Sequence, residues 1–267
     1  MSHIDKALEL YGGDIKAGAK TPTSTGLFSV DKDSPPLEEG KRKIFHSVFA
    51  TLLWVGTMAR PDILVALSYL GKRTTKANDD DEKKLERLLS YIKATCGMPL
   101  TLGIDNLQVK SFDVYEDMKS HSGLLGSFGL GAIFAKSVTQ RLNATSSTKS
   151  EVIACSEVLP QALWTTSFLH HQGFEIKKAL IHQDNEAAML LDGNGVNSRK
   201  RRSRHIDIRF FFIKDRIEIG DVEIAFCGTK SMIDDYLKKP LQGRAFQVFR
   251  DDIMGINPTM DTTEGVC

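Results

Sequence analysis

The sequence predicts an α/β fold in which a mixed five-stranded sheet packs against flanking helices, with a small helical segment before it. Three short runs, residues 107–114, 123–128 and 132–137, are rich in β-branched or aromatic residues and are separated by glycine or polar residues, which indicates an antiparallel meander. A long helical pattern from Val152 to Gln172 follows, and strand-like and helical segments then alternate up to a strand at residues 222–227. Helices packed on such a sheet form an α/β or α+β core of ordinary domain size.

The segment before the sheet divides into two parts. Residues 12–41 are rich in Gly, Pro, Ser and Thr, which favours a linker or an arm. Apolar residues then recur at helical spacing in three stretches, 44–55, 61–70 and 85–92, and a proline at position 61 separates the first two. We therefore expect a flexible arm at 1–40, a helical segment at 41–103, the main domain at 104–245, and a C-terminal helix and tail at 246–267.

Composition excludes several classes of protein. The 267 residues include 35 basic and 34 acidic residues, so a polyanion would have to be held by a local basic patch. Four scattered cysteines without a C-x-x-C pair argue against a zinc site or a disulfide framework and favour a reducing, cytoplasmic compartment. No apolar run approaches the roughly 20 residues that a membrane span needs, so we expect no membrane association.

Asp184 is the acid with the clearest strand context. A short apolar run, Leu180–His182, is followed by Gln183, Asp184 and Asn185 and then by a helical pattern. A buried strand of this kind would hold Asp184 at its carboxyl end, where open α/β sheets keep their sites. Asp184 could equally cap the next helix, because Asp and Asn are favoured at that position.

Three further acids could share a metal site with Asp184, namely Asp113, Glu151 and Asp235. Hydrolysis of a phosphodiester commonly uses two divalent ions held by convergent carboxylates, and hard oxygen ligands suit Mg²⁺. Each acid also has a structural explanation: Thr148 and Glu151 fit a capping box, and Asp235 could be a first-turn acid. The acidic run at residues 79–82 resembles a metal cluster as well, but acids at a helix start favour the macrodipole.

The densest cationic run of the chain is the basic segment, whose basic side chains are Arg199, Lys200, Arg201, Arg202 and Arg204. Such a run gives sequence-independent, salt-sensitive affinity for nucleic-acid phosphates. It could instead be a solvated loop or a nuclear-import signal. His205, which follows it, could move protons near the acids or make a structural hydrogen bond. The glycines of residues 126–131 have the wrong order for a dinucleotide fingerprint and indicate turns.

Several motifs together resemble one family, the Ty1/copia-type retrotransposon polyproteins, in the region where reverse transcriptase ends and ribonuclease H follows. They are Ala59–Ile63, Leu85–Lys93, Ser146–Glu151, Gln183–Asn185, Arg204–Arg209 and Lys239–Leu241, in this order. The similarity covers roughly residues 41 to 254, and the words Met118–His121 and Lys239–Gly243 resemble diatom-like members.

The resemblance implies a ribonuclease H fold that cuts the RNA strand of an RNA/DNA hybrid with Mg²⁺, for which Mn²⁺ could substitute. Glu151, Asp184 and Asp235 match the second, third and fourth acids of the family. The helical segment would be a remnant of the reverse-transcriptase thumb or connection. The hybrid and the parent reverse transcriptase are the expected partners, and a cytoplasmic virus-like particle is the expected location, with the nucleus as an alternative.

The position of the family's first acid departs from the family pattern, because too few residues separate Asp113 from the motif Asp117–His121. Counting back from this motif without a gap places Val109 at the position of the first acid. If the hairpin carries a deletion, Asp113 takes that position instead, and we prefer this second alignment. No Tyr-x-Asp-Asp word of a polymerase site occurs in the chain. The expected function is therefore ribonuclease H activity without a polymerase site, and the alternative is a degenerate, non-catalytic nucleic-acid-binding remnant.

Overall fold

The computed structural model describes residues 2–103, 108–114, 121–139, 147–175, 178–183, 204–226, 237 and 239–256. Within these ranges only the backbone is described for residues 108–114, 121–122, 139, 147–152, 183, 204–207, 210 and 226. The chain divides into two compact units. Unit 1 comprises Met1–Thr101 and Lys239–Ile256, and unit 2 comprises Leu102–Lys238 and Asn257–Cys267.

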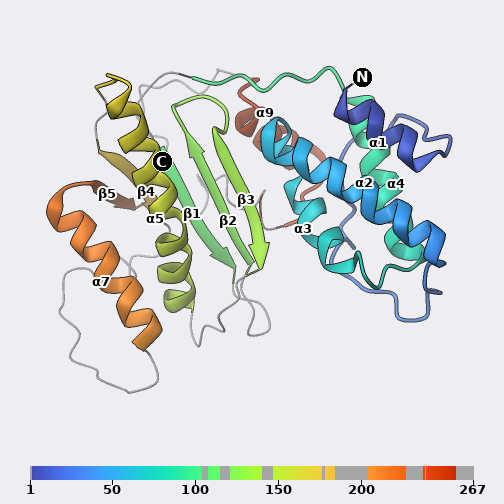
Figure 1. Cartoon of the computed structure of the whole chain (residues 1–267), viewed down its shortest axis with the longest axis horizontal. Helices are drawn as coiled ribbons and strands as arrows, with labels where there is room; N and C mark the ends of the chain where they lie inside the picture. Colours follow the sequence, from blue (N-terminus) through green and yellow to red (C-terminus); the bar gives the residue numbers. More distant parts are fainter. Residues whose placement is uncertain are drawn as a thin grey trace. The chain divides into compact units, whose positions relative to one another are not determined.

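Unit 1 is built from helices, and the three helices expected from apolar spacing are confirmed. They are α2 (Glu39–Met58), α3 (Leu64–Arg73) and α4 (Asp79–Ala94), and a short 3₁₀ turn, η1 (Pro61–Ile63), precedes α3 (Figure 1). Pro61 starts this turn, since proline lacks a backbone N–H and is favoured in the first turn of a helix, where that N–H would have no partner. The core of the unit contains fully buried side chains from all three helices, whereas Ile44 and Leu53 of α2 are exposed. The buried ones are Leu52, Leu67, Leu70, Leu85, Leu88, Leu89 and Ile92.

The expected N-terminal arm is ordered and packed, which corrects the prediction for residues 1–40. The helix α1 (His3–Tyr11) begins with a Ser2 capping box, and Leu27 is 2% exposed. Thr21 bonds with both Arg87 of α4 and Gln242, which is the N-cap of α9 (Gly243–Ile253). The C-terminal helix, predicted as a separate segment, therefore belongs to unit 1 as well.

A buried ion pair fixes the turn between α2 and α3. The guanidinium of Arg60 donates to both carboxylate oxygens of Asp62 at 2.8 and 2.7 Å, and Tyr91 of α4 donates to the same carboxylate at 2.7 Å. Burial and the neighbouring charge of Asp62 raise the pKa of the Tyr91 hydroxyl. Because both charges are satisfied, the pair joins α2, η1 and α4 without leaving an unpaired buried group.

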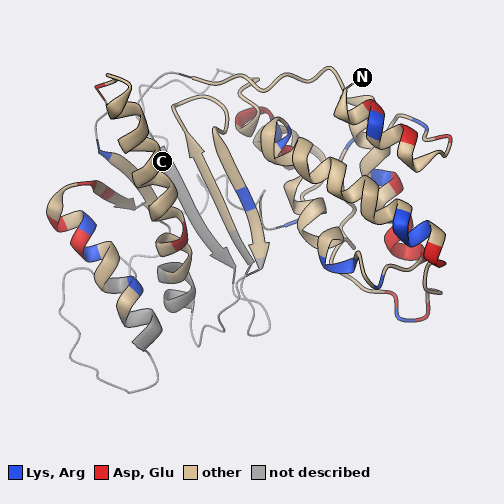
Figure 2. Cartoon of the chain, viewed as in Figure 1, with Lys and Arg blue, Asp and Glu red and all other residues tan. Residues whose placement is uncertain are grey.

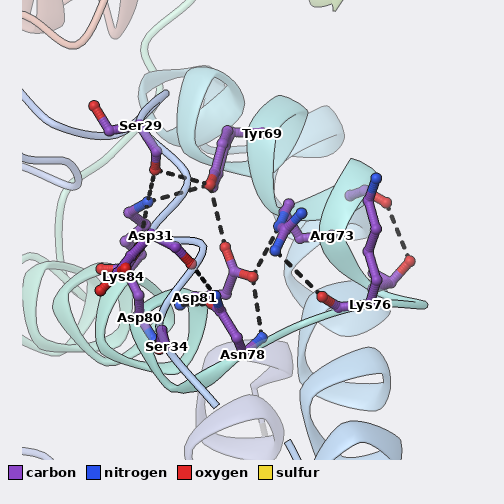
Figure 3. Close-up of polar contacts among 12 residues, drawn as sticks. Ser29, Asp31, Ser34, Tyr69, Arg73, Lys76, Asn78, Asp80, Asp81 and Lys84 are labelled. Atoms are coloured by element: carbon purple, nitrogen blue, oxygen red, sulfur yellow. Dashed lines mark hydrogen bonds and ion pairs between the residues drawn. The ribbon is translucent and has the colours of Figure 1, made fainter. Parts of the chain in front are cut away.

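A second polar cluster surrounds the start of α4 (Figure 3). Asp81 is fully buried and accepts from Arg73 Nε at 2.8 Å, from Tyr69 at 3.2 Å and from the Asn78 amide at 3.1 Å. The Asn78 side chain accepts from the Asp81 amide at 3.0 Å, which completes a capping box. The acids at residues 79–82 thus begin a helix, as the structural interpretation of this run predicted.

Replacing Asn78 with alanine is expected to lower the free energy of unfolding by about 1 kcal/mol, because the cap of α4 is lost. The same change removes the bond from Asn78 Nδ2 to the Asp31 carbonyl, 2.8 Å away. Urea unfolding should show a lower midpoint with an unchanged slope. Asn78→Ser keeps a capping oxygen and should recover most of the loss, and equal stability of all three chains would contradict the assignment.

Unit 2 contains a mixed sheet in the order β3-β2-β1-β4-β5. Its strands are β1 (Gln108–Val114), β2 (His121–Ser127), β3 (Phe134–Thr139), β4 (Ala179–Gln183) and β5 (Val222–Phe226). The predicted antiparallel meander is confirmed, since β1 pairs with β2 and β2 with β3 in antiparallel register. The pairs β1–β4 and β4–β5 are parallel. A mixed α/β unit is therefore present, as expected.

Two helices pack on this sheet, α5 (Ser147–His171) and α7 (Arg204–Ile219) (Figure 1). The core joins residues from both helices and three strands: Leu124, Cys155, Val158, Leu159, Ala162, Ala179, Ile181, Ile213 and Val222. Glycine ends α5 as predicted, because Gly173 adopts a φ of 86° after the last turn. Pro160 lies within the helix, also as predicted.

The glycine-rich stretch at residues 126–131 forms the connection between β2 and β3. Gly129 and Gly131 have φ values of 88° and 63°, which confirms that the glycines serve a turn. In the described part of the chain, no helix combines the length and the apolar character that a membrane crossing requires.

Candidate functional site at the carboxyl edge of the sheet

Strand directions bring four chain segments to one edge of the sheet. The strands β1, β4 and β5 are mutually parallel, and β3 runs the same way because two antiparallel steps separate it from β1. These strands end at Val114, Thr139, Gln183 and Phe226. Their carboxyl ends therefore meet at one edge, which is where ligands bind in open α/β sheets.

The helices α5 and α7 begin at this same edge. The last residue of α5 is His171 and β4 starts at Ala179, while only Gly220 and Asp221 separate α7 from β5. Short connections of this kind require each helix to run opposite to the strand that follows it. Figure 1 shows α5 and α7 running in the same direction. The amino ends of both helices consequently lie at the carboxyl edge.

The structure places the backbone of four predicted site residues at or near this edge. Asp113 is the last residue but one of β1, Glu151 lies in the second turn of α5, and Arg204 and His205 are the first two residues of α7. Asp184 directly follows Gln183, the last residue of β4, and itself lies outside the described residues. The remaining predicted residues also lie outside them: Asp235, Arg199, Lys200, Arg201 and Arg202.

The register of β1 against β4 separates the two candidates for the first acid. Val109 pairs with Ile181 and Lys110 with His182, and Ile181 is fully buried. Asp113 lies three positions beyond Lys110, towards the carboxyl edge. Position 113 is therefore the one of the two that lies near the end of β4.

The described start of α5 differs from the helix start that the capping-box interpretation of Glu151 requires. That interpretation needs Thr148 at the cap, outside the helix, with Glu151 as the third helical residue. The helix α5 instead begins at Ser147, so Thr148 already lies within it.

Arg209 links the two helices, a contact that the sequence does not reveal. Its guanidinium donates to the Ser156 hydroxyl at 2.6 Å and lies 3.8 Å from the Glu157 carboxylate. Ser156 is buried, and its own hydroxyl donates to the Ile153 carbonyl at 2.7 Å. Figure 2 shows that α7 carries several charged residues among those described in unit 2, whereas the described strand residues are mostly uncharged.

The carboxylates that were predicted to bind a metal at this edge belong to side chains outside the described set. Among the side chains that the structure describes, no group of three or more His, Cys, Asp or Glu is arranged to hold a metal ion. The donors brought to the edge by the backbone are carboxylates, which suit Mg²⁺ or Mn²⁺ and do not suit a soft metal. The topology is thus compatible with a hard divalent ion.

Comparison with known proteins identifies the relatives of the chain. It is 24% identical over 259 residues to the retrovirus-related Pol polyprotein from transposon TNT 1-94 of Nicotiana tabacum, which covers 93% of the chain. It is 26% identical over 237 residues to the corresponding polyprotein from transposon RE1 of Arabidopsis thaliana, covering 85% of the chain. The chain is a homologue of plant retrotransposon Pol polyproteins. It spans 19% and 15% of the length of these two Pol relatives.

The Pol homologue also has a structural neighbour, a foamy viral protease-reverse transcriptase solved in complex with an RNA/DNA hybrid. The match has a TM-score of 0.48 at 11% identity and covers 85% of this chain and 27% of the viral chain. No family model matches the sequence. The relation to Pol expected from the motifs is therefore confirmed by the sequence relatives.

Proposed function

We propose that unit 2 is a ribonuclease H-like domain that hydrolyses the RNA strand of an RNA/DNA hybrid. The observation that carries the proposal is the convergence at one edge of the sheet of Asp113, Glu151 and the end of the strand that precedes Asp184. The homology to Pol polyproteins supports it, because the matched region covers both units of the chain.

The proposed metal ligands are the carboxylates of Asp113, Glu151, Asp184 and Asp235. Asp113 lies in β1 and Glu151 in α5, and Asp184 and Asp235 follow β4 and β5 in the sequence. All four are therefore proposed to act at the carboxyl edge, although they are far apart in sequence. When bound, two Mg²⁺ ions supply activation of the attacking water and stabilisation of the leaving oxygen. Acids from these different elements can act together only if β1, β4 and β5 keep their parallel pairing.

The basic segment supplies the proposed binding surface for the hybrid. Arg204 begins α7 at the carboxyl edge, and the other cationic residues, Arg199 to Arg202, immediately precede it in the sequence. Contacts with phosphates give affinity without sequence preference, which an enzyme acting on any hybrid needs. His205 directly follows and is proposed to assist proton transfer or product release at the same edge.

The test is incubation of the full chain with a labelled RNA/DNA hybrid and Mg²⁺ or Mn²⁺, followed by electrophoresis of both strands. The expected result is shortening of the RNA strand alone, with no cleavage in the presence of EDTA. Matched double-stranded DNA and double-stranded RNA of the same sequence serve as controls. An intact RNA strand under all metal conditions would refute the enzymatic function.

A second function is a non-catalytic module that retains binding to nucleic acid, favoured by one observation. The spacing between Asp113 and the following strand departs from the family pattern. Binding of the hybrid, measured by fluorescence anisotropy, separates the two functions. If the chain binds the hybrid with salt-dependent affinity but does not cleave it, the non-catalytic binding module is established. If it neither binds nor cleaves the hybrid, both functions are excluded.

A further inference from the structure

Arg209 contacts α5 through a hydrogen bond to Ser156 and an ion pair with Glu157, and apolar residues of the two helices also share one buried cluster. Val158, Leu159 and Ile213 belong to one buried cluster. Apolar packing holds two helices together but is non-directional. It therefore does little to fix the position of one helix along the axis of the other. A hydrogen bond loses its strength steeply when its geometry changes. The 2.6 Å bond from Arg209 to Ser156 is therefore suited to fix the axial position of α7 on α5.

Two predicted site residues, Glu151 and His205, precede the bonded residues of their own helices by similar numbers of residues. Glu151 precedes Ser156 by five residues in α5, and His205 precedes Arg209 by four residues in α7. At a rise of about 1.5 Å per residue these offsets are about 7.5 and about 6 Å. Because the two helices run in the same direction (Figure 1), both residues lie between the Arg209–Ser156 bond and the amino ends of the helices, on the side of the carboxyl edge.

We propose that Arg209 is a positioning residue that anchors α7 on α5 and thereby fixes the place of His205, the second residue of α7, at the carboxyl edge of the sheet. This inference rests on the proposed ribonuclease function. Arginine suits the task because its planar guanidinium can donate to the Ser156 hydroxyl while it faces the Glu157 carboxylate. A lysine ammonium at this position would keep the charge but lose the fixed geometry of the donors.

The kinetic test uses full-length Arg209→Met and Arg209→Lys chains with the RNA/DNA hybrid. Arg209→Met should lower kcat at least about tenfold and leave KM and hybrid affinity within about twofold, since a positioning defect acts on the chemical step. Arg209→Lys should be intermediate. The matched control is Arg216→Met, which removes an arginine paired with Asp215 and Asp221 at the other end of α7. It should keep wild-type kcat.

A double-mutant cycle tests whether Arg209 acts through His205. If it does, the chain carrying both Arg209→Met and His205→Ala should be no slower than His205→Ala alone. Multiplicative losses would overturn the positioning role, as would an unchanged kcat in Arg209→Met or an equal loss in Arg216→Met.

Hydrogen exchange supplies a readout that does not depend on catalysis. Amides near Ile208 should exchange at least about tenfold faster in Arg209→Met than in the wild type, because the first turns of α7 lose their anchor. Exchange near Ile217 should not change. Unchanged exchange near Ile208 would refute the anchoring even in a chain that cleaves. An intact hybrid with the wild-type chain would instead refute the proposed function and, with it, the catalytic part of this inference.

Discussion

An Asp184→Asn chain is expected to bind the RNA/DNA hybrid within severalfold of the wild type and to cleave none of it. Asn keeps the size of the side chain but removes the negative charge that a divalent ion requires. Metal assistance contributes several kcal/mol of transition-state stabilisation, and each 1.4 kcal/mol corresponds to a factor of ten in rate. The measurement is the yield of shortened RNA in single-turnover reactions with excess protein.

Asp221→Asn is the matched control for this experiment. Asp221 immediately precedes β5, so the same chemical change is made at the opposite, amino edge of the same sheet. Its ion pair with Arg216, at 3.1 Å, is partly exposed and contributes little to stability. The control should cleave at the wild-type rate. Cleavage by Asp184→Asn at that same rate would show that the acid site is elsewhere.

Asp113→Asn is expected to lower cleavage at least about a hundredfold, because it removes the charge of the proposed first metal ligand. Val109→Ala should keep cleavage near the wild-type rate per folded molecule. The reason is the β1–β4 register, in which Val109 pairs with Ile181 inside the sheet and Asp113 lies near the end of the strand. Rates should be divided by the folded fraction from urea unfolding.

The opposite pattern would reverse the assignment of the first acid. If Asp113→Asn cleaves as fast as the wild type, the carboxylate at position 113 takes no part in metal binding. The gap in the hairpin would then have been placed wrongly, and the domain would work without an acid at the first family position.

Local patterns were sufficient to predict the framework of unit 2. The meander at residues 107–137 and the helix expected from Val152 to Gln172 agree with β1–β3 and α5, apart from shifts at the ends. These elements are set by the spacing of apolar residues and by glycine at turns, both of which act over a few neighbouring residues. The approach of the site segments to one edge follows from the strand order alone.

Long-range contacts explain what local patterns could not predict. The N-terminal residues have the composition of a linker, yet Thr21 meets Arg87 and Gln242 across 66 and 221 residues. The bond between Arg209 and Ser156 likewise spans 53 residues. Such contacts depend on the tertiary arrangement, and no spacing rule within one element reports them.

The discontinuity of unit 1 has a consequence for the order of synthesis. Phe246 of α9 packs edge-on against Tyr91 at 5.7 Å between ring centroids, and the Thr101 amide donates to the Met254 carbonyl at 2.9 Å. Tyr91 and Thr101, the partners in the earlier part of the chain, leave the ribosome long before α9 is made. Because domains generally fold as units during translation, unit 2 can complete its sheet while unit 1 still lacks its last helix. A nascent chain stalled before residue 243 would therefore expose the Tyr91 side of unit 1 to chaperones.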